Sequence, residues 1–311
     1  MKNRTVLINR LAALFTVVVW GTTYIFTKYL LTRFWPGQLL LVRLTLAWFV
    51  LLLFNLRDYK RPRLKYEIVC FFLALTGVFG YFMFESFALT KTYSANVGLL
   101  MSTTPLFTAI ISHIALRSER FTFDTGLGFI SAISGISIVL LNGAILKLNP
   151  VGDVFALLAA VSFAFYSVIM RSFPVAKDIG QHVVVRKTFG YAALLLVPVV
   201  IFNGGYNSLK DSFVWMVTDY KAIGSMIFLV LIASSLCFFL WNVVVDRIGP
   251  VQAAGFIYLV PLVSTLAAGL VLMEKITAMM IAGGFLIVLG VYISESKPLK
   301  RYNKVDSISP Q

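Results

Sequence analysis

Apolar stretches of about 20 residues recur along almost the whole chain, and a helix of that length crosses a hydrocarbon layer of ~30 Å. Ten such stretches are recognised, at about residues 11–30, 36–56, 67–89, 95–116, 124–143, 151–171, 183–203, 223–245, 251–272 and 277–294. Because they use roughly 200 of the 311 residues, too little remains for a separate soluble domain. The sequence therefore predicts an all-α polytopic membrane protein with ten transmembrane helices.

The composition excludes an ordinary soluble domain. Hydrophobic residues make up 59% of the chain and charged residues 13%, with a mean hydropathy of +0.88. The formal net charge of +14 would suggest a nucleic-acid partner in a soluble protein, but here it is better explained by the sidedness of a membrane protein. We therefore expect the lipid bilayer, and no nucleic acid, as a partner.

Lysine and arginine are distributed unequally between alternate loops. With a cytoplasmic N-terminus, cytoplasmic segments carry 17 of these residues and the opposite loops 6, while four lie in or beside the stretches. Cationic loops are retained on the cytoplasmic side. We expect a multi-pass protein of a bacterial inner (cytoplasmic) membrane with both termini in the cytoplasm. Residues 295–311 are expected to form a disordered cytoplasmic tail.

The chain also repeats itself. One proline, one glutamate, one threonine and two glycines occur twice in the same order: Pro105, Glu119, Thr122, Gly128 and Gly135, then Pro261, Glu274, Thr277, Gly283 and Gly290. The copies are 156 residues apart at the proline and 155 afterwards. Earlier in each half three further pairs are 143 residues apart: Trp20 with Phe163, Lys28 with Arg171, and Arg43 with Arg186. A single insertion, in a polar loop at residues 204–221, explains the change in register.

Each half contains five apolar stretches, and an odd number reverses the orientation of the second half in the membrane. Residues 8–143 and 150–294 are therefore predicted to form two inverted five-helix repeats. Inverted repeats suit carriers, because two quasi-equivalent halves can exchange conformations and open a central cavity to either side. A channel or an enzyme has less need of this symmetry.

Several short motifs resemble those of the EamA-type carriers of the drug/metabolite transporter (DMT) superfamily. They are Trp20-Gly21, Leu41-Val42-Arg43-Leu44, Thr104-Pro105-Leu106, Ser118-Glu119-Arg120-Phe121-Thr122, Val260-Pro261-Leu262 and Met273-Glu274-Lys275-Ile276-Thr277. Ser118 and Met273 stand where the family usually has glycine before the acid. The likeness covers residues 8–294 and implies a ten-helix carrier of small organic metabolites, commonly an exporter of amino acids or toxic compounds.

Glu85 is the one acidic residue placed well inside an apolar stretch. If the third stretch ends near Leu89, this carboxyl group lies about 6 Å below the edge of the membrane. An unpaired carboxylate is costly at that depth. Two interpretations stay open. In the first, Glu85 binds a solute amine or a proton. In the second it has a structural role, either in an ion pair that holds helices together or as a group at the water-exposed edge of the membrane.

Arg43 lies about 10 Å along the second stretch, and the repeat relates it to the shallower Arg186. A guanidinium group keeps its proton, so Arg43 must face a partner, water or lipid headgroups. A solute carboxylate would satisfy it, as would a structural contact with Glu85 or with backbone carbonyls. Lys28 and Arg171 lie near the ends of stretches and are long enough to reach the interface.

Pro105 and Pro261 fall inside apolar stretches, where each removes a helical hydrogen bond and should bend the helix. They are candidates for a hinge or gate, although proline is also common in membrane helices without such a role. Gly128 and Gly135 are seven residues apart, as are the equivalent glycines of the second half. Each pair returns to one helical face and predicts close helix packing.

The remaining candidates for solute binding are polar or aromatic side chains within or at the edges of the stretches: Trp20, Tyr24, Tyr81, Asn96, Ser162, Tyr166, Trp241, Asn242, Gln252 and Tyr258. Amides in hydrocarbon need partners, so they either bridge helices or face a cavity. Asn96 and Gln252 occupy equivalent positions, 156 residues apart. Aromatic residues at the ends of stretches can instead belong to the interfacial belt.

No cofactor, metal site or catalytic residue is predicted. The chain has no P-loop, its histidines lie on different stretches without acids at metal-ligand spacing, and Cys70 and Cys237 lie in apolar runs. We expect a secondary transporter that moves a small-molecule solute, an amino acid or similar compound, in the export direction. Protons are a possible coupling partner through Glu85. The alternatives are a passive uniporter or channel-like facilitator, a metabolite importer and a membrane-embedded enzyme.

Overall fold

A computed structural model describes residues 2–53, 63–91, 94–115, 123–141, 150–203, 206–272 and 278–295, and these residues form helices joined by short turns. Six described segments are long and apolar enough to cross a membrane: Leu7–Leu30, Pro36–Leu53, Leu64–Lys91, Val154–Ser172, Gln181–Phe202 and Tyr220–Ile248. Four shorter apolar helices are Thr104–Ala115, Gly126–Gly135, Pro250–Ser264 and Ile281–Gly290. The all-helical prediction is confirmed for the described residues, while ten membrane crossings remain a prediction.

The described residues of the first half of the chain, up to residue 141, form eight helical elements. They are α1 (Lys2–Leu30), α2 (Pro36–Leu53), α3 (Leu64–Leu73), the π-helix η1 (Ala74–Gly80), α4 (Tyr81–Lys91), α5 (Ser94–Met101), α6 (Thr104–Ala115) and α7 (Phe123–Leu141). Pro36 begins α2, where its fixed φ suits the first helical turn and its missing N–H costs no hydrogen bond. The segments α3, η1 and α4 follow one another without a break.

The second half, from residue 150, contains eleven elements within the described residues. They are α8 (Pro150–Ser172), α9 (Ala176–Ile179), α10 (Gln181–Phe202), α11 (Tyr206–Thr218), α12 (Tyr220–Ile227), the π-helix η2 (Phe228–Leu236), α13 (Cys237–Ile248), α14 (Pro250–Gly255), the 3-10 helix η3 (Phe256–Leu259), α15 (Val260–Leu272) and α16 (Ala278–Glu295). Gly180 and Gly249 precede α10 and α14 with φ of 86° and 87°, which glycine adopts without strain.

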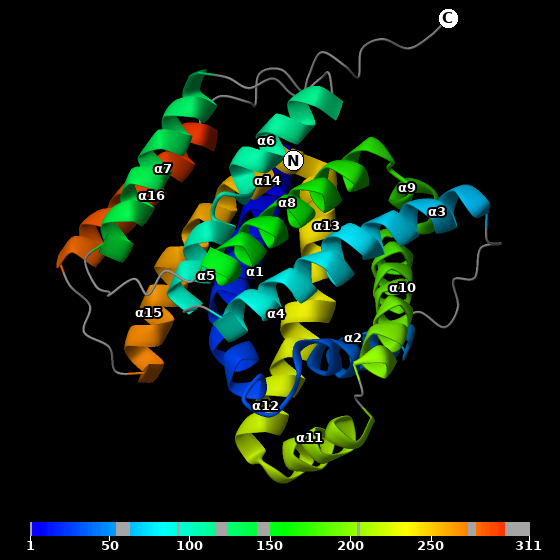
Figure 1. The fold of residues 1–311 in the computed structure, drawn as a ribbon. Helices are drawn as coiled ribbons and strands as arrows, with labels where there is room; N and C mark the ends of the chain where they lie inside the picture. The colour runs from blue at the N-terminus through cyan, green and yellow to red at the C-terminus, as the bar shows by residue number, and fades with distance from the viewer. Residues whose placement is uncertain are drawn as a thin grey trace, which may run out of the picture.

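The prediction of a polar loop at residues 204–221 is wrong for most of this segment. Residues 206–218 form α11, which lies across one end of the bundle (Figure 1). Ser212 and Met216 face the protein, while Phe213 and Val217 are exposed, so only one side of the helix is buried. The first turns of α11 contain the exposed polar residues Ser208, Lys210 and Asp211, which lower its hydropathy, so the sequence resembles a loop.

Two apolar stretches contain π-helical segments at equivalent places in the two halves, η1 and η2. In a π-helix the hydrogen bonds run between residues five apart, which shifts the backbone register of the helix locally. The fourth stretch is interrupted at Ser102 and Thr103, directly before Pro105. The ninth stretch passes through η3 directly before Val260 and Pro261. The irregular backbone therefore falls at matching positions of the repeat.

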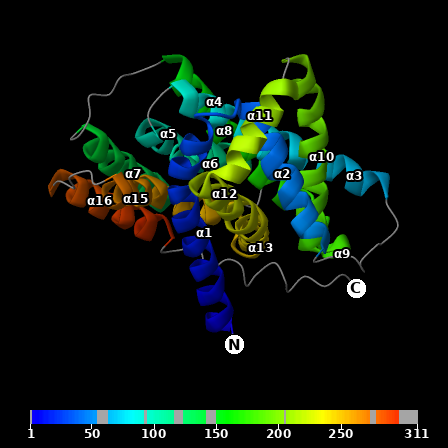
Figure 2. The same ribbon diagram turned by 90° about the horizontal axis from the view of Figure 1, so that it is seen from below.

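Helices α7 and α16 lie side by side at one edge of the molecule (Figures 1 and 2). A Cβ atom added at Gly135 would lie 2.4 Å from the carbonyl oxygen of Gly283, and one added at Gly290 would lie 2.5 Å from that of Gly128. The pairing is antiparallel and reciprocal. The glycines predicted to serve close packing therefore meet each other across the two halves.

Contacts between the two halves form the centre of the bundle. Helix α1 packs against α13 and α15, α4 packs against α8, and α2 packs against α10. In Figure 2, α1 lies between the group of α7, α15 and α16 and the group of α2, α3 and α10. Residues from both halves therefore line one shared core.

Some predicted features lie outside the described residues. They are the repeat positions Glu119, Thr122, Glu274 and Thr277, the tail at residues 296–311, and the side chain of Asn96.

Candidate functional site

Arg43 of α2 is buried at the centre of the bundle, with 1% of its surface exposed. Its Nε donates a hydrogen bond of 2.8 Å to the hydroxyl of Ser234 in η2. Its Cζ lies 4.3 Å from the centre of the Phe82 ring, within the range of a cation–π interaction. The guanidinium group thus contacts a serine of the other half and an aromatic face.

Glu85 of α4 is buried beside Arg43, with 3% of its surface exposed. Its Oε1 accepts a 2.7 Å hydrogen bond from the hydroxyl of Tyr81, one helical turn earlier. Arg43 attracts the Glu85 carboxylate electrostatically, but within the described part of the chain no ion pair joins the two. Tyr24 of α1, which is also buried, interacts electrostatically with the same carboxylate. The Arg43 guanidinium group and the Glu85 carboxyl group therefore lie near each other without a direct ion pair.

Four aromatic rings from both halves meet beside these charges. The ring of Trp20 lies 5.5 Å from Phe163, 5.4 Å from Phe238 and 5.1 Å from Trp241, as measured between ring centres. The indole N–H of Trp20 donates a 3.1 Å hydrogen bond to the carbonyl of Ala233. Trp20 and Phe163, which the repeat pairs by sequence, are thus in contact at the centre of the protein.

Two ring contacts join the aromatic residues to the charged groups. Phe163 lies 5.0 Å from Tyr81, the tyrosine bonded to the carboxylate, and Phe238 lies 5.6 Å from Phe82, the ring under the guanidinium. The result is one continuous set of side chains, called the central cluster below. It consists of Trp20, Arg43, Tyr81, Phe82, Glu85, Phe163, Phe238 and Trp241.

Polar groups adjoin the central cluster on its α8 and α13 side. The hydroxyl of Tyr166 donates to Oδ1 of Asn242, and the Tyr166 ring lies 5.7 Å from that of Phe163. The Nδ2 of Asn242 and the Nε1 of Trp241 are buried without a hydrogen-bond partner among the described residues. Since a buried donor without a partner is costly, these two N–H groups are available to a bound molecule.

The structure brings most of the sequence candidates together. Besides the members of the central cluster, Tyr24, Tyr166 and Asn242 lie next to it. Ser162 lies close by on α8, where its hydroxyl donates a 2.8 Å hydrogen bond to the carbonyl of Thr76.

Four candidates lie elsewhere. Tyr258 of η3 faces Phe129 of α7, with ring centres 6.2 Å apart, and Gln252 lies on α14. Pro105 and Pro261 are buried as the second residues of α6 and α15, outside the central cluster.

The two π-helices accept matching hydrogen bonds. Trp20 of α1 donates to Ala233 in η2, and Ser162 of α8 donates to Thr76 in η1. Each bond runs from the first helix of one half to a π-helical carbonyl of the other half. Sequence patterns gave no indication of these carbonyl acceptors, because π-helices form without a distinctive residue pattern.

A polar contact between α3 and α10 was also missed. Glu67 forms an ion pair with Lys187, and its Oε2 accepts a 2.7 Å hydrogen bond from the hydroxyl of Tyr191. These three residues are called the Glu67 latch below. Glu67 is the first residue of the third predicted stretch, where an acidic residue does not by itself indicate a function. Only its contacts with Lys187 and Tyr191 in the structure identify it.

The opposite end of the bundle carries a second set of contacts between the halves, called the α11 latch below. It consists of three hydrogen bonds: Gln38 Nε2 to Ser208 Oγ at 2.7 Å, Ser212 Oγ to the Arg33 carbonyl at 2.7 Å, and Tyr29 hydroxyl to Asp219 Oδ2 at 3.1 Å. Asp219 also caps α12 by accepting bonds from the N–H groups of Lys221 and Ala222. These bonds, led by that from Ala222, lower the pKa of Asp219 from its usual value.

Other polar residues have structural partners. Arg171 donates a 2.8 Å hydrogen bond to the carbonyl of Asp246 near the end of α13. Lys28 is half-buried and also interacts with another group of the protein. Cys70 and Cys237 are both buried free thiols.

Comparison with known sequences gives a family match in both halves. The profile of the EamA-like transporter family matches residues 8–141 and 150–295. A protein of Archaeoglobus fulgidus named as an uncharacterized transporter is 26% identical over 280 residues, which is 89% of this chain and 95% of that protein. A protein of Salmonella typhimurium named "Probable amino-acid metabolite efflux pump" is 26% identical over 292 residues, which is 91% of this chain and 93% of that protein.

A comparison with solved structures agrees on the fold. One crystal structure of a protein superposes with a TM-score of 0.73 at 20% identity, and the match covers 95% of this chain and 98% of the other. At that identity the match shows a shared fold and nothing about the solute.

Proposed function

Because the chain belongs to the EamA-like transporter family, a group of multi-pass membrane carriers, we propose that it is a secondary transporter exporting an amino acid or a similarly charged metabolite. The observation that carries this proposal is the buried pair of Arg43 and Glu85 inside the central cluster. A zwitterion presents one carboxylate and one ammonium group, which match these two charges. The name of the Salmonella typhimurium relative supports both the solute class and the direction.

The chemistry of the central cluster suits such a solute. A guanidinium group binds a carboxylate with two parallel hydrogen bonds. Arg43 uses its Nε to bind Ser234, and its two terminal nitrogens can donate to a solute carboxylate. Glu85 would then accept the ammonium group. The apolar part of the solute would lie against the rings of Trp20 and Trp241, and the unpartnered Nε1 of Trp241 is one further donor. In a site closed to water these interactions are stronger than at a surface.

Transport requires that this buried site open to one side and then to the other. The Glu67 latch and the α11 latch join the two halves at opposite ends of the bundle. We propose that one latch opens while the other stays closed, which is alternating access by rocking of one half against the other. The central cluster is then exposed first to the cytoplasm and then to the outside.

Two symmetric features support the proposal that residues 8–143 and 150–294 are inverted repeats. The hydrogen bonds from Trp20 and Ser162 to the π-helices are reciprocal, and so are the glycine contacts between α7 and α16. Reciprocal contacts are typical of halves related by a two-fold axis. With the charge distribution between loops, they support ten crossings and cytoplasmic termini in a bacterial inner membrane.

Pro105 and Pro261 are proposed as hinges. Each follows an interruption of regular α-helix, at Ser102–Thr103 and at η3. Thr104 donates its hydroxyl to the carbonyl of Met101, the group that the proline ring leaves without its helical partner. Because the threonine hydroxyl replaces the hydrogen bond that the proline cannot make, the helix can bend here without leaving the Met101 carbonyl unpaired.

Coupling is proposed to run through Glu85. A proton taken up by this carboxylate and an ammonium group bound to it exclude each other, so proton entry would release the solute. Glu85→Gln should then abolish the dependence of transport on a pH gradient. Solute exchange should persist only at higher solute concentration, because the neutral amide binds the ammonium group more weakly than the carboxylate does. Asp211→Asn, at an exposed acid of α11, is the matched control. Unchanged gradient dependence in Glu85→Gln would remove the coupling role.

Binding tests the solute class. The purified protein is mixed with amino acids, purines and quaternary amines, and tryptophan fluorescence is read, since Trp20 and Trp241 belong to the central cluster. Arg43→Ala should weaken binding of amino acids far more than binding of the corresponding amines that lack the carboxylate. Arg33→Ala, at an exposed arginine beyond α1, is the control. Equal losses for both ligand classes would show that Arg43 is purely structural.

A further inference from the structure

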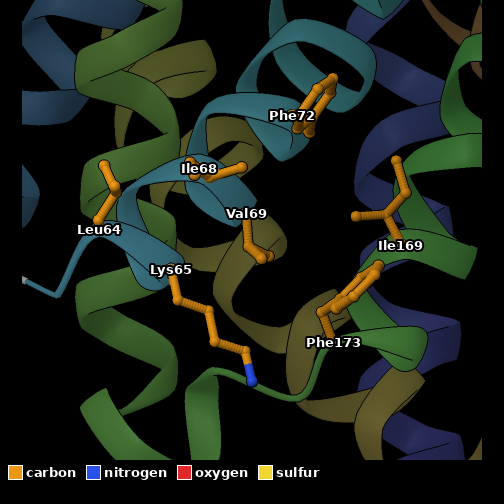
Figure 3. Close-up of a pocket in the computed structure, with 7 residues that line it drawn as sticks. All are labelled: Leu64, Lys65, Ile68, Val69, Phe72, Ile169 and Phe173. Carbon is orange, nitrogen blue, oxygen red and sulfur yellow. The ribbon is translucent and has the colours of Figure 1, made fainter.

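A cavity of about 590 Å³ lies between α3 and the end of α8, away from the central cluster. It is lined by Leu64, Lys65, Ile68, Val69, Phe72, Ile169 and Phe173. Figure 3 shows the apolar side chains facing one another across the groove, with Lys65 at its lower end. Its walls are apolar except for this one ammonium group, so the groove does not suit a polar solute.

The groove is open along the outer surface of the bundle. Ile68, Phe72 and Phe173 have 47%, 48% and 50% of their surface exposed, whereas Val69 is buried and forms the floor. Leu64, Ile68 and Phe72 follow one another at four-residue spacing on one face of α3. On a membrane-spanning helix, such an exposed apolar face lies against hydrocarbon.

The length of the groove corresponds to one leaflet of a bilayer. From Leu64 to Phe72 the helix rises about 12 Å, and half of a hydrocarbon core is about 15 Å. A groove of this length accommodates most of one acyl chain running parallel to α3.

Positive charge gathers at the end of the groove where α3 begins. Arg63 precedes α3, Lys65 lies in its first turn, and Lys177 lies on the short helix α9 that follows Phe173; all three side chains are exposed. Of the nearby acids, Glu67 is paired with Lys187, and Asp178, which accepts a hydrogen bond from Tyr66, offsets only one of these three cations. This end therefore presents an excess of cations beside an apolar groove.

We propose that the groove binds an anionic phospholipid, with one acyl chain between α3 and α8 and its phosphate beside Lys65. A long lysine side chain suits this position, because its methylene groups cover apolar surface while its ammonium group stays at the headgroup level. Basic residues beside grooves between membrane helices select anionic headgroups. The inference is independent of the transported solute, because none of these residues belongs to the central cluster.

Native mass spectrometry of the full chain in neutral detergent tests the proposal. The probes are phosphatidylglycerol and phosphatidylcholine with identical acyl chains. The wild-type protein should bind phosphatidylglycerol several times more tightly, and Lys65→Gln should weaken that binding about fivefold. Binding of phosphatidylcholine should weaken much less, because its choline ammonium group offsets the phosphate charge. Lys221→Gln, at an exposed lysine of α12, should match the wild type.

A second variant tests the acyl-chain part of the site. Ile169→Trp fills the groove and should reduce binding of both lipids, with Ile169→Phe as the milder replacement if the tryptophan variant does not fold. Three results would overturn the proposal: equal binding of the two lipids by the wild type, no effect of Lys65→Gln, or full binding by a folded groove-filling variant. A dimer that dissociates in Ile169→Trp would show instead that a second copy of the chain occupies the groove.

Discussion

Gly135 packs directly against the backbone of Gly283, so that a Cβ atom at Gly135 would lie 2.4 Å from the Gly283 carbonyl oxygen. The neighbour is backbone and cannot rotate away as a side chain would. Gly135→Ala should therefore separate α7 from α16 and cost about 1–3 kcal/mol, the usual penalty of overpacking. The thermal unfolding midpoint in detergent should fall.

The control for this prediction is Gly224→Ala in α12. A Cβ added at Gly224 meets no atom within 4 Å, so alanine should leave the unfolding midpoint unchanged or raise it through its better helix propensity. Equal effects of the two alanines would contradict the close packing of α7 on α16.

Ser234 should be needed to hold Arg43. Ser234→Ala removes the hydroxyl that accepts from Nε and leaves a buried charged donor without that partner. The expected loss of stability is about 1–3 kcal/mol, with weaker solute binding because the guanidinium group is no longer fixed. Ser235→Ala is the matched control, because Ser235 bonds only to the carbonyl of Val230 on its own helix. If both variants behave alike, the hydrogen bond does not position Arg43.

The Glu67 latch should show energetic coupling. Glu67→Gln and Lys187→Gln each break the ion pair, so the double variant should lose less stability than the two single losses combined. The coupling is expected at about 0.5–2 kcal/mol, the range of polar pairs between membrane helices. A thermal unfolding series of the four proteins measures it, and strictly additive losses would refute the latch.

The cap at Asp219 should make stability depend on pH. A carboxyl group whose pKa is lower in the folded protein stabilises the fold above its unfolded-state pKa, and this contribution is lost as the pH falls through the folded-state value. The wild type should therefore unfold at a higher temperature than Asp219→Asn at neutral pH, and the difference should disappear in acid below the usual aspartate pKa. A difference that is constant with pH would show that the charge has no part in the cap.

Several residues that meet at the centre of the protein could be selected from the sequence alone. Trp20, Arg43 and Glu85 are large or charged residues inside apolar stretches, and hydrocarbon tolerates such residues only with specific partners. The glycines were identified because their seven-residue spacing returns to one helical face. In both cases the physical constraint acts on a single stretch and is therefore visible in it.

The partners of these residues could not be predicted in the same way. Ser234 is a small polar residue among many, and its bond to Arg43 depends on how η2 packs against α2. The pairing of Glu67 with Lys187 joins two helices 120 residues apart. Helix α11 was missed because polar residues are frequent in its first turns, and its buried side chains are recognised only from their contacts with Gln38, Arg33 and Tyr29.

Counterflow in vesicles tests the central claim most directly. Vesicles containing the purified protein are loaded with an unlabelled amino acid that binds, and uptake of the labelled compound is followed with and without Arg43→Ala and Glu85→Gln. A carrier with its site in the central cluster predicts transient, saturable accumulation that Arg43→Ala abolishes and that Glu85→Gln retains only at higher solute concentration. Flux that rises linearly with concentration and is unaffected by Arg43→Ala would contradict the account and indicate a channel-like facilitator.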